Sequence, residues 1–287
     1  EVTFIVVPTP SEVAGGFTLK YVLSACNSIG EALKSKDDFH LVVLTSTVMP
    51  GSTQESVCPA LEEASGKSCG TDFGVCYSPE FIALGSVIRD FLNPDFLLIG
   101  ESDPVSGDTL ESLYAQVCNN SPQVSRMNFV NAELAKLAVN TFVTTKITFA
   151  NMLAHICEQL PGAQVDTVTS ALGLDSRIGP KYLKGAIGYG GPCFPRDSVA
   201  LATLGTRIGA PVLLAEATHK ANQEEVHRLA DLVTSMLPAS GVVGVLGLAY
   251  KPDTDVIEES QGFLLAQELA ERGISTVAYD PAALGAT

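Results

Sequence analysis

The segment Gly188–Asp197, with the sequence GYGGPCFPRD, combines residue types that could form a reactive site. Its glycines allow positive φ angles and a close approach of the backbone to a ligand, whereas its prolines interrupt regular structure. Cys193 lies within this loop, and Arg196 and Asp197 follow it. A thiol in such a setting is a candidate nucleophile. The loop by itself fits a buried structural cysteine equally well, because cysteines are among the most buried residues.

A second group of chemically useful residues lies on a predicted helix. Residues 132–159 contain neither Gly nor Pro, so a helix of about 40 Å is expected there. Lys136 and Asn140 are four residues apart in it and therefore share one face. Together they could stabilise an oxyanion and hold a water molecule, although on their own they fit a solvated helical face better.

Polar residues also follow three predicted strands. Short apolar runs predict buried strands at residues 2–7, 41–44 and 73–77. Ligands of parallel sheets bind at the carboxyl ends of the strands. The residues after these ends, and thus further site candidates, are Thr9, Thr47 and Glu80. An isolated Thr in such a place is more often a helix cap or a turn residue.

The elements that must position these residues form three regions. The first alternates the three strands above with helices at residues 18–34, 52–65 and 105–118 and a strand at 96–99. Apolar strands alternating with helices indicate a parallel sheet covered on both faces. The second region is all-helical, with helices at residues 132–159, 163–173, 197–208 and 212–237. The third is a βαβ unit, with strands at 242–248 and 275–279 around a helix at 260–272. The fold class is therefore α/β.

Composition excludes several classes of protein. The 287 residues are 46% apolar and only 17% charged, which indicates about two domains without long disordered tracts. A net charge of −15 argues against nucleic acid as a partner but allows a phosphorylated small molecule. No run of apolar residues is long enough to span a membrane, and we expect no signal peptide. The seven cysteines include no CxxC pair and the histidines lack ligand spacing, so we expect neither a disulfide framework nor a metal site, and a cytoplasmic location.

Both ends of the chain look cut, because Glu1 leads directly into a strand and the last residues stop just after another. We therefore expect a fragment of a longer protein. The glycines at 241, 244 and 247 lie within a predicted strand rather than after it, so they do not form a dinucleotide fingerprint. If the protein is a dinucleotide enzyme, its phosphate-binding turn is expected outside this chain.

Seven segments carry a resemblance to a known family: FIVVPTP at residues 4–10, STVMPG at 46–51, SPEF at 78–81, ELAKLAVN at 133–140, RIG at 177–179, the loop at 188–197 and GLAYKPDTD at 247–255. In this order, and over nearly its whole length, the chain resembles the UDP-glucose/GDP-mannose 6-dehydrogenase family. The resemblance implies two Rossmann-like parallel-sheet units, both truncated, around a central helical region. The implied domains are an NAD-binding domain at 1–125, a dimerisation and catalytic region at 126–228 and the start of a nucleotide-sugar-binding domain at 229–287.

The resemblance implies a double oxidation of a sugar C6 alcohol to a carboxylate, with two NAD⁺ reduced. Cys193 would attack the aldehyde to give a thiohemiacetal and then a thioester, which water hydrolyses. Lys136 and Asn140 would stabilise the alkoxide. Asp197 would move protons with a bound water, and Glu80 would act as acid or base in the hydrolysis.

The resemblance also assigns binding residues. Thr47 would help to hold both the water and the cofactor. The NAD site would be lined by Pro8, Thr9, Pro10, Ser11, Ser46, Thr47 and Arg196. The nucleotide sugar would contact Glu80, Phe81, Lys136, Asn140, Arg177, Lys184, Tyr189, Gly190, Tyr250 and Lys251. Arg177 would reach across a homodimer formed by the central helices, and no metal is implied.

Three residues depart from the family's usual pattern: Leu84 stands in place of a Glu, Arg196 of a Lys and Glu258 of an Arg. The sequence does not distinguish among UDP-glucose, an N-acetylated UDP-hexosamine and GDP-mannose as the substrate. Two alternatives stay open. One is a β-hydroxyacid-type dehydrogenase, which oxidises once and needs no thiol; the other is an inactive nucleotide-sugar-binding fragment.

Overall fold

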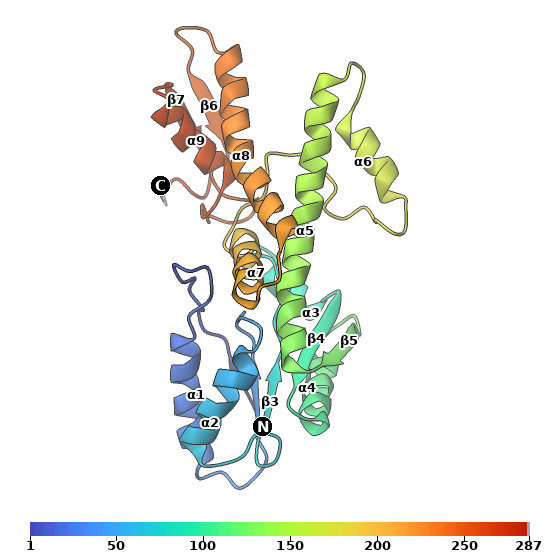
Figure 1. Ribbon diagram of the computed structural model, residues 1–287, viewed down its shortest axis with the longest axis vertical. Coiled ribbons are helices and arrows are strands. Elements are labelled where there is room, and N and C mark those ends of the chain that lie inside the picture. Colours follow the sequence, from blue (N-terminus) through green and yellow to red (C-terminus); the bar gives the residue numbers. More distant parts are fainter. Residues whose placement is uncertain (286–287) are drawn as a thin grey trace. The chain divides into compact units, whose positions relative to one another are not determined.

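The computed structural model describes residues 1–285, and contacts within the chain group it into two compact units, Glu1–Ala138 and Val139–Thr287 (Figure 1). The division into three domains at residues 125 and 228 stays a prediction. The α/β fold class is confirmed, with a mostly parallel sheet in the first unit and helices followed by a βαβ unit in the second.

The first unit is built on a five-stranded sheet with the order β1-β2-β3-β4-β5 within residues 1–285. Its strands are β1 (Val2–Ile5), β2 (Leu41–Leu44), β3 (Gly74–Tyr77), β4 (Phe96–Glu101) and β5 (Gln123–Met127). Its helices are α1 (Lys20–Leu33), a π-helical turn (Thr53–Val57), α2 (Cys58–Ser65), α3 (Val87–Leu92), α4 (Pro104–Val117) and the start of α5 (Phe129–Gln159). Because β1, β2 and β3 pair in parallel, their carboxyl ends lie at one edge of the sheet.

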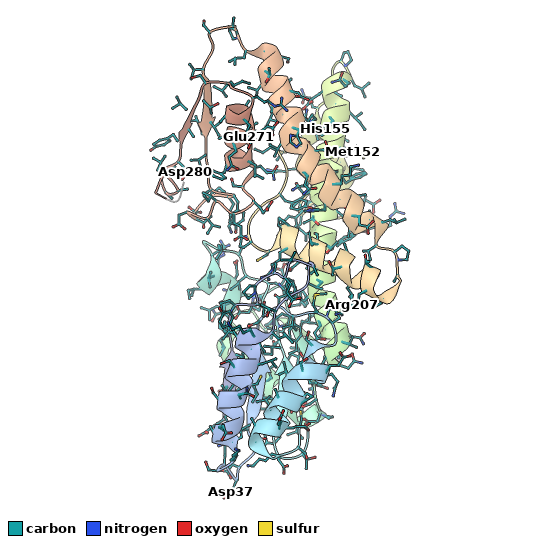
Figure 2. All side chains as sticks on the ribbon, turned by 60° about the vertical axis from the view of Figure 1, so that its left-hand side comes forward. Asp37, Met152, His155, Arg207, Glu271 and Asp280 are labelled. Carbon is teal, nitrogen blue, oxygen red and sulfur yellow. The ribbon has the colours of Figure 1, made fainter. Side chains whose placement is uncertain are left out.

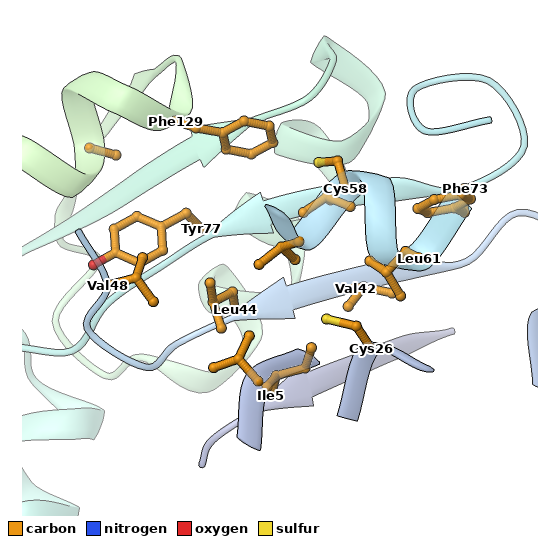
Figure 3. Packing of buried hydrophobic residues seen from close by; sticks show 14 of the residues in the cluster. Ile5, Cys26, Val42, Leu44, Val48, Cys58, Leu61, Phe73, Tyr77 and Phe129 are labelled. Carbon is orange, nitrogen blue, oxygen red and sulfur yellow. The ribbon is translucent and has the colours of Figure 1, made fainter. Parts of the chain in front are cut away.

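The inner strand β2 is buried on both faces because its side chains alternate between two cores. Val42 and Leu44 pack with residues of α1 and α2, as Figure 3 shows. Leu41 and Val43 pack on the opposite face with Leu110 of α4. The apolar runs that predicted β2 and β3 therefore correspond to fully covered strands.

Two expectations for this sheet are wrong. The run at residues 2–7 is not a fully buried strand: β1 ends at Ile5, and Phe4 is 39% and Val6 68% exposed, because β1 is the edge strand of the sheet described. The sheet is also not wholly parallel, since β4 pairs antiparallel with β3. The connection between β3 and β4 consists of an irregular segment and the six-residue helix α3. It does not return the chain to the amino end of β3, as a parallel connection would, so β4 runs in the opposite direction.

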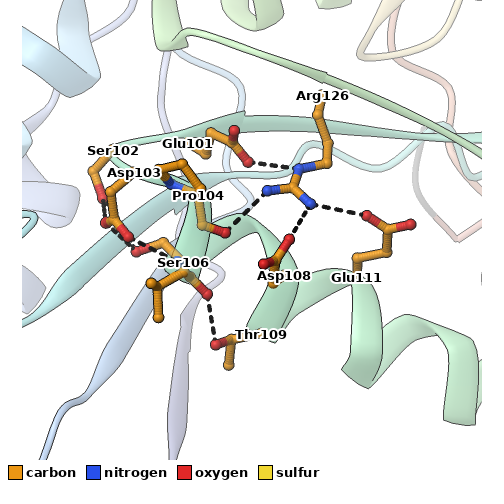
Figure 4. Close-up of polar contacts among 10 residues, drawn as sticks. Glu101, Ser102, Asp103, Pro104, Ser106, Asp108, Thr109, Glu111 and Arg126 are labelled. Atoms are coloured by element: carbon orange, nitrogen blue, oxygen red, sulfur yellow. Dashed lines mark hydrogen bonds and ion pairs between the residues drawn. The ribbon is translucent and has the colours of Figure 1, made fainter.

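The strand β5 and the short helix α3 were not expected. The sequence of β5, QVSRM, is too polar to read as a strand, but β5 pairs along its whole length with β4. Arg126 of β5 also holds three carboxylates: Nε lies 2.7 Å from Oε2 of Glu101, and Nη1 contacts Asp108 and Glu111 (Figure 4). Hydrogen bonding to β4 and the ion pairs of Arg126 thus stabilise a strand that the pattern of apolar residues does not predict.

The second unit starts within α5, whose 31 residues correspond to about 46 Å of helix. The helices α6 (Val165–Gly173), α7 (Phe194–Ile208) and α8 (Leu213–Met236) follow, as expected. A parallel pair, β6 (Val243–Leu246) and β7 (Thr276–Tyr279), flanks α9 (Gln261–Glu271). Its small core joins α8, α9 and β6 through residues such as Ala230, Leu269 and Val245. None of the helices in residues 1–285 is both long and apolar enough to cross a membrane.

Candidate functional site

In the first unit, hydrogen bonds join the loops that follow β1 and β2. The Ser46 hydroxyl donates to the carbonyl of Val7 at 2.6 Å and accepts from the Val7 N–H at 3.0 Å. The hydroxyl of Thr9, which is only 5% exposed, donates to the carbonyl of Thr47 at 2.7 Å. The predicted cofactor residues Thr9, Ser46 and Thr47 are thus brought together at the carboxyl edge of the sheet.

The other predicted cofactor residues near this edge of the sheet lie at the protein surface. Pro8, Pro10 and Ser11 are exposed. Ser11 forms an isolated antiparallel bridge with Phe17, and the Pro10 carbonyl accepts from the Thr18 N–H at 3.0 Å. The segment therefore folds back on itself and presents its prolines to solvent.

Lys136 of α5 lies against the segment that follows β3. Its ammonium group donates to the main-chain carbonyl of Glu80 at 2.7 Å and lies 4.4 Å from the centre of the Phe81 ring, a cation–π distance. Burial raises the pKa of the Glu80 carboxyl, and the nearby charge of Lys136 lowers it by less. An acid whose pKa is raised toward neutrality suits proton transfer. The predicted residues Glu80, Phe81 and Lys136 thus form one group.

Glu133, one turn before Lys136, was not predicted to have a role at the site. It is fully buried, and its carboxylate accepts from the N–H groups of Gly51 at 2.6 Å and Thr53 at 2.8 Å. It therefore joins α5 to the end of the loop that carries Thr47. The sequence shows an acid on an apolar helix, but no local pattern indicates its partners.

In the second unit, Cys193 is exposed and directly precedes α7. The start of a helix favours negative charge, which suits a thiolate. One turn into α7, Asp197 is 1% exposed, and its N–H donates to the Cys193 carbonyl at 2.9 Å. Asn140 donates from Nδ2 to Oδ2 of Asp197 at 2.6 Å, and Arg196 Nε lies 3.6 Å from Oδ1. The structure brings these four predicted residues together.

The glycines of the loop before Cys193 are required by close packing. A Cβ atom at Gly190 would lie 2.0 Å from the carbonyl oxygen of Glu259. At Gly191, where φ is +83°, a Cβ would lie 2.5 Å from the ring of Tyr250. The Gly191 N–H donates to the Glu258 carbonyl at 3.0 Å. The loop is thus pressed against the segment that precedes α9, and the ring of the predicted substrate residue Tyr250 lies against Gly191, the neighbour of the predicted residue Gly190.

Tyr189 is held by two side-chain amides that were not predicted. Asn222 of α8 accepts from the Tyr189 N–H at 2.8 Å and donates to its carbonyl at 2.9 Å. Gln261 of α9 donates to the same carbonyl at 3.0 Å. Both amides are 7% exposed, so these contacts are shielded from water. The sequence did not indicate these contacts, because Asn and Gln on helices of mixed polarity are usually exposed to solvent.

The remaining predicted substrate residues differ in placement. Lys251 lies 5.7 Å from the centre of the Tyr250 ring. Arg177 instead pairs with Asp175, with Nη2 and Oδ2 2.6 Å apart, and Lys184 is exposed. The segment leading to Tyr250 is held by Asp280, labelled in Figure 2, which accepts from the N–H groups of residues 248, 249, 282 and 283.

Residues 1–285 contain no group of three or more side chains placed to bind a metal ion. None of the seven cysteines forms a disulfide in this described part of the chain.

Comparison with known proteins gives consistent matches along the chain. Residues 1–118 match the NAD binding domain of the UDP-glucose/GDP-mannose dehydrogenase family, residues 130–224 its central domain and residues 244–286 its UDP binding domain. A UDP-glucose 6-dehydrogenase of Haloferax volcanii is 38% identical over 99% of the chain and 66% of its own length. A GDP-mannose 6-dehydrogenase of Azotobacter vinelandii is 33% identical over 98% of the chain and 63% of its own length.

A solved structure gives the same result for the fold. The UDP-glucose dehydrogenase from the archaeon Pyrobaculum islandicum matches with a TM-score of 0.91 and 36% identity, covering 100% of the chain and 65% of that structure. The chain spans between 60% and 66% of the length of the first curated relatives that it matches. From these matches over all parts of its length, the chain belongs to the UDP-glucose/GDP-mannose dehydrogenase family.

Proposed function

We propose that this chain forms part of an NAD-dependent nucleotide-sugar 6-dehydrogenase that oxidises the C6 alcohol of a nucleotide sugar, of the UDP-hexose type, to the uronate. The observation that carries the proposal is the exposed thiol of Cys193 at the start of α7, with the buried pair of Asn140 and Asp197 one turn away. A single oxidation of an alcohol needs no thiol. A double oxidation does, because the intermediate aldehyde must be held.

In the proposed reaction, removal of hydride and proton from the C6 alcohol gives an aldehyde. The Cys193 thiolate adds to its carbon, and the oxygen takes up a proton to give a thiohemiacetal. Loss of a second hydride and proton gives a thioester. Water attacks the thioester carbon, the C–S bond breaks, and the carboxylate and the thiol are released.

The other residues of the chain would serve these steps. Lys136 and Asn140 would stabilise negative charge on the C6 oxygen. Asp197, held by Asn140, would accept or return protons through water, and Glu80 would do so in the hydrolysis. Tyr189, Gly190, Tyr250 and Lys251 are proposed to contact the nucleotide sugar, with Phe81, Arg177 and Lys184 in supporting roles.

NAD⁺, when bound, would accept the hydride of each oxidation. At the carboxyl edge of the sheet, the hydroxyls of Thr9 and Ser46 donate to the carbonyls of Thr47 and Val7, which fixes the two loops that are proposed to contact the ribose and the amide of a dinucleotide. A pyrophosphate needs a glycine-rich turn or cations, and no GxGxxG follows a strand in residues 1–285. The residues present therefore fit one side of a dinucleotide site, to which Pro8, Pro10, Ser11 and Arg196 are proposed to contribute.

The test incubates the purified protein that contains this chain with NAD⁺ and a panel of UDP- and GDP-sugars, and counts NADH per sugar consumed. Two NADH and a uronate are expected. Cys193→Ala should abolish acid formation, whereas Cys118→Ala, at a partly buried cysteine of the first unit, should not. One NADH with an aldehyde or ketone product, unaffected by Cys193→Ala, would favour the single-oxidation enzyme. Nucleotide-sugar binding without NADH would favour the inactive binding protein.

We also propose a homodimer through the central helices, in a cytoplasmic setting. Phe142, Phe149, Met152 and Ile156 form an apolar stripe along α5 and are between 45% and 65% exposed. A groove of about 680 Å³ borders this stripe, lined by residues of α5 and α8. Phe149→Glu should shift the mass in light scattering from dimer to monomer. Val105→Glu, on α4 and also exposed, should leave it unchanged.

A further inference from the structure

Two cysteines of the first unit lie side by side, apart from the residues assigned above. Cys58 begins α2 and is 4% exposed, whereas Cys69 lies in the loop before β3 and is partly exposed. Their Sγ atoms are 3.7 Å apart. A disulfide has an S–S distance of about 2.05 Å, so small rotations of the two side chains would bring the sulfur atoms into bonding range.

The backbone around Cys69 is fixed in this position. Its N–H donates to Oε1 of Glu62, which lies on the same helix as Cys58, at 2.9 Å. The Ser68 N–H donates to Asp72 at 2.9 Å, and the Gly70 N–H to the Phe73 carbonyl at 2.8 Å. Because Glu62 ties the loop directly to α2, the two thiols keep their proximity without any movement of the helix.

The two thiols differ in reactivity. Hydrogen bonding with Cys58, and further with Ser102, lowers the pKa of the Cys69 thiol even though burial opposes this. The contact with Cys69 and burial raise the pKa of the Cys58 thiol. Cys69 is also the one that solvent reaches. It is therefore the residue that an oxidant would meet first, with Cys58 behind it as the resolving thiol.

We propose that Cys58 and Cys69 form a reversible intramolecular disulfide when the protein is exposed to a peroxide. The Cys69 thiolate attacks one oxygen of hydrogen peroxide, the O–O bond breaks, and a sulfenic acid and water form once a proton is taken up. The Cys58 sulfur then attacks the Cys69 sulfur, and the S–O bond breaks to release a second water. Two thiols are oxidised, and one peroxide is reduced to two waters.

The crosslink lies away from the proposed reaction. Cys69 precedes β3, and Ser102, whose hydroxyl accepts from the Val75 N–H, follows β4 at the same amino end of β3. Thr47 and Glu80, in contrast, follow carboxyl ends of strands. The expected consequence is greater stability of the first unit, because the closed loop restricts its unfolded chain.

The test treats the folded protein with hydrogen peroxide, alkylates the remaining thiols and maps the peptides without reduction. We expect the peptides of Cys58 and Cys69 joined and lighter by two hydrogen atoms, and a rise in melting temperature of about 5 °C that dithiothreitol reverses. Cys69→Ser should lose both effects; it is the preferred variant because Cys69 is partly exposed and the fold should tolerate the change. Cys118→Ser should keep both.

Alkylated Cys58 beside overoxidised Cys69 would overturn the proposal, as would full alkylation of both thiols after treatment. The exposed Cys193 will also react, but peptide mapping separates its products. Because the readout is a covalent bond and a melting temperature, the result does not depend on whether the protein oxidises a nucleotide sugar.

Discussion

Glu133 in the first unit and Asp280 in the second are buried carboxylates that hold main-chain N–H groups near the proposed site residues. Glu133 accepts from two N–H groups and Asp280 from four. The pKa of Glu133 is raised, because burial outweighs its hydrogen bonds. The pKa of Asp280 is lowered, because hydrogen bonds from residues 249, 282, 283 and 248 outweigh burial.

The difference follows from the balance between burial and hydrogen bonding. At Glu133, burial is the largest influence and penalises the ionised form. At Asp280, the N–H groups aimed at the carboxylate are the largest influence and favour the ionised form. Glu133 connects a helix to a distant loop with few donors, whereas Asp280 closes a nest of donors around the ends of β6 and β7.

The largest effect should come from removing the carboxylate of Glu133. Glu133→Ala leaves the N–H groups of Gly51 and Thr53 without their acceptor, and should cost about 3 kcal/mol in the free energy of unfolding measured with urea. Glu63→Ala, at an exposed acid of α2, should cost less than about 0.5 kcal/mol. Equal losses in the two variants would mean that the carboxylate does not hold the loop.

In the second unit, we expect the next largest loss of stability from a change that disturbs close packing rather than from the loss of a charge. Gly190→Ala places a Cβ against the Glu259 carbonyl and should cost about 2 kcal/mol in unfolding free energy, together with a loss of nucleotide-sugar affinity in calorimetry. Gly244→Ala in β6, where a Cβ meets no atom within 4 Å, is the matched control. If Gly190→Ala unfolds like this control, the glycine loop is not pressed against its neighbour.

The two carboxylates should give opposite pH dependences. The folded-state pKa of Asp280 lies below its usual 3.8, so its stabilisation is present above pH 3.8 and is lost as the pH falls through the folded value. The folded-state pKa of Glu133 lies above its usual 4.5, so its contribution is complete below pH 4.5 and declines as the pH rises through the folded value.

Melting curves from pH 3 to 7 check this, with Asp280→Asn and Glu133→Gln as mimics of the protonated forms. The difference between the wild-type protein and Asp280→Asn should grow as the pH rises. Relative to Glu133→Gln, the wild-type protein should instead lose stability as the pH rises above 4.5. Two differences that change in the same direction would contradict the comparison.

The smallest effect is expected at the surface cluster of Arg126. Glu111 lies 3.2 Å from the guanidinium but its side chain is 43% exposed. Glu111→Ala should therefore change the free energy of unfolding by less than about 0.5 kcal/mol, and less still in high salt. A loss of more than about 1 kcal/mol in the free energy of unfolding would mean that this surface ion pair stabilises the protein as much as a buried carboxylate does.

Sequence patterns predicted the elements that are covered by apolar neighbours. The strands β2 and β3 and the long helix α5 follow from composition alone, and the spacing of Lys136 and Asn140 follows from helical periodicity. The polar strand β5 could not be predicted in this way, because it is stabilised by pairing with β4 and by the contacts of Arg126 rather than by apolar side chains. The antiparallel direction of β4 depends on how its connection folds, which no local pattern encodes.

The groups that hold the candidate site were the least predictable. The hydrogen bonds of Asn222 and Gln261 to Tyr189 span 33 and 72 residues of sequence. A buried amide and a solvated amide look alike in a single sequence, since both sit on helices of mixed polarity. Only the packing of α8 and α9 distinguishes them.

The contact between Gly191 and residue 258 has a consequence for substitutions. The glycine loop is held there through the main-chain carbonyl of Glu258, while the side chains of Glu258 and Glu259 point into solvent. Every amino acid has that carbonyl, so mutation at position 258 leaves the anchor of the loop intact. A substitution at position 258 can thus change the charge displayed beside the loop without rebuilding the backbone that supports it.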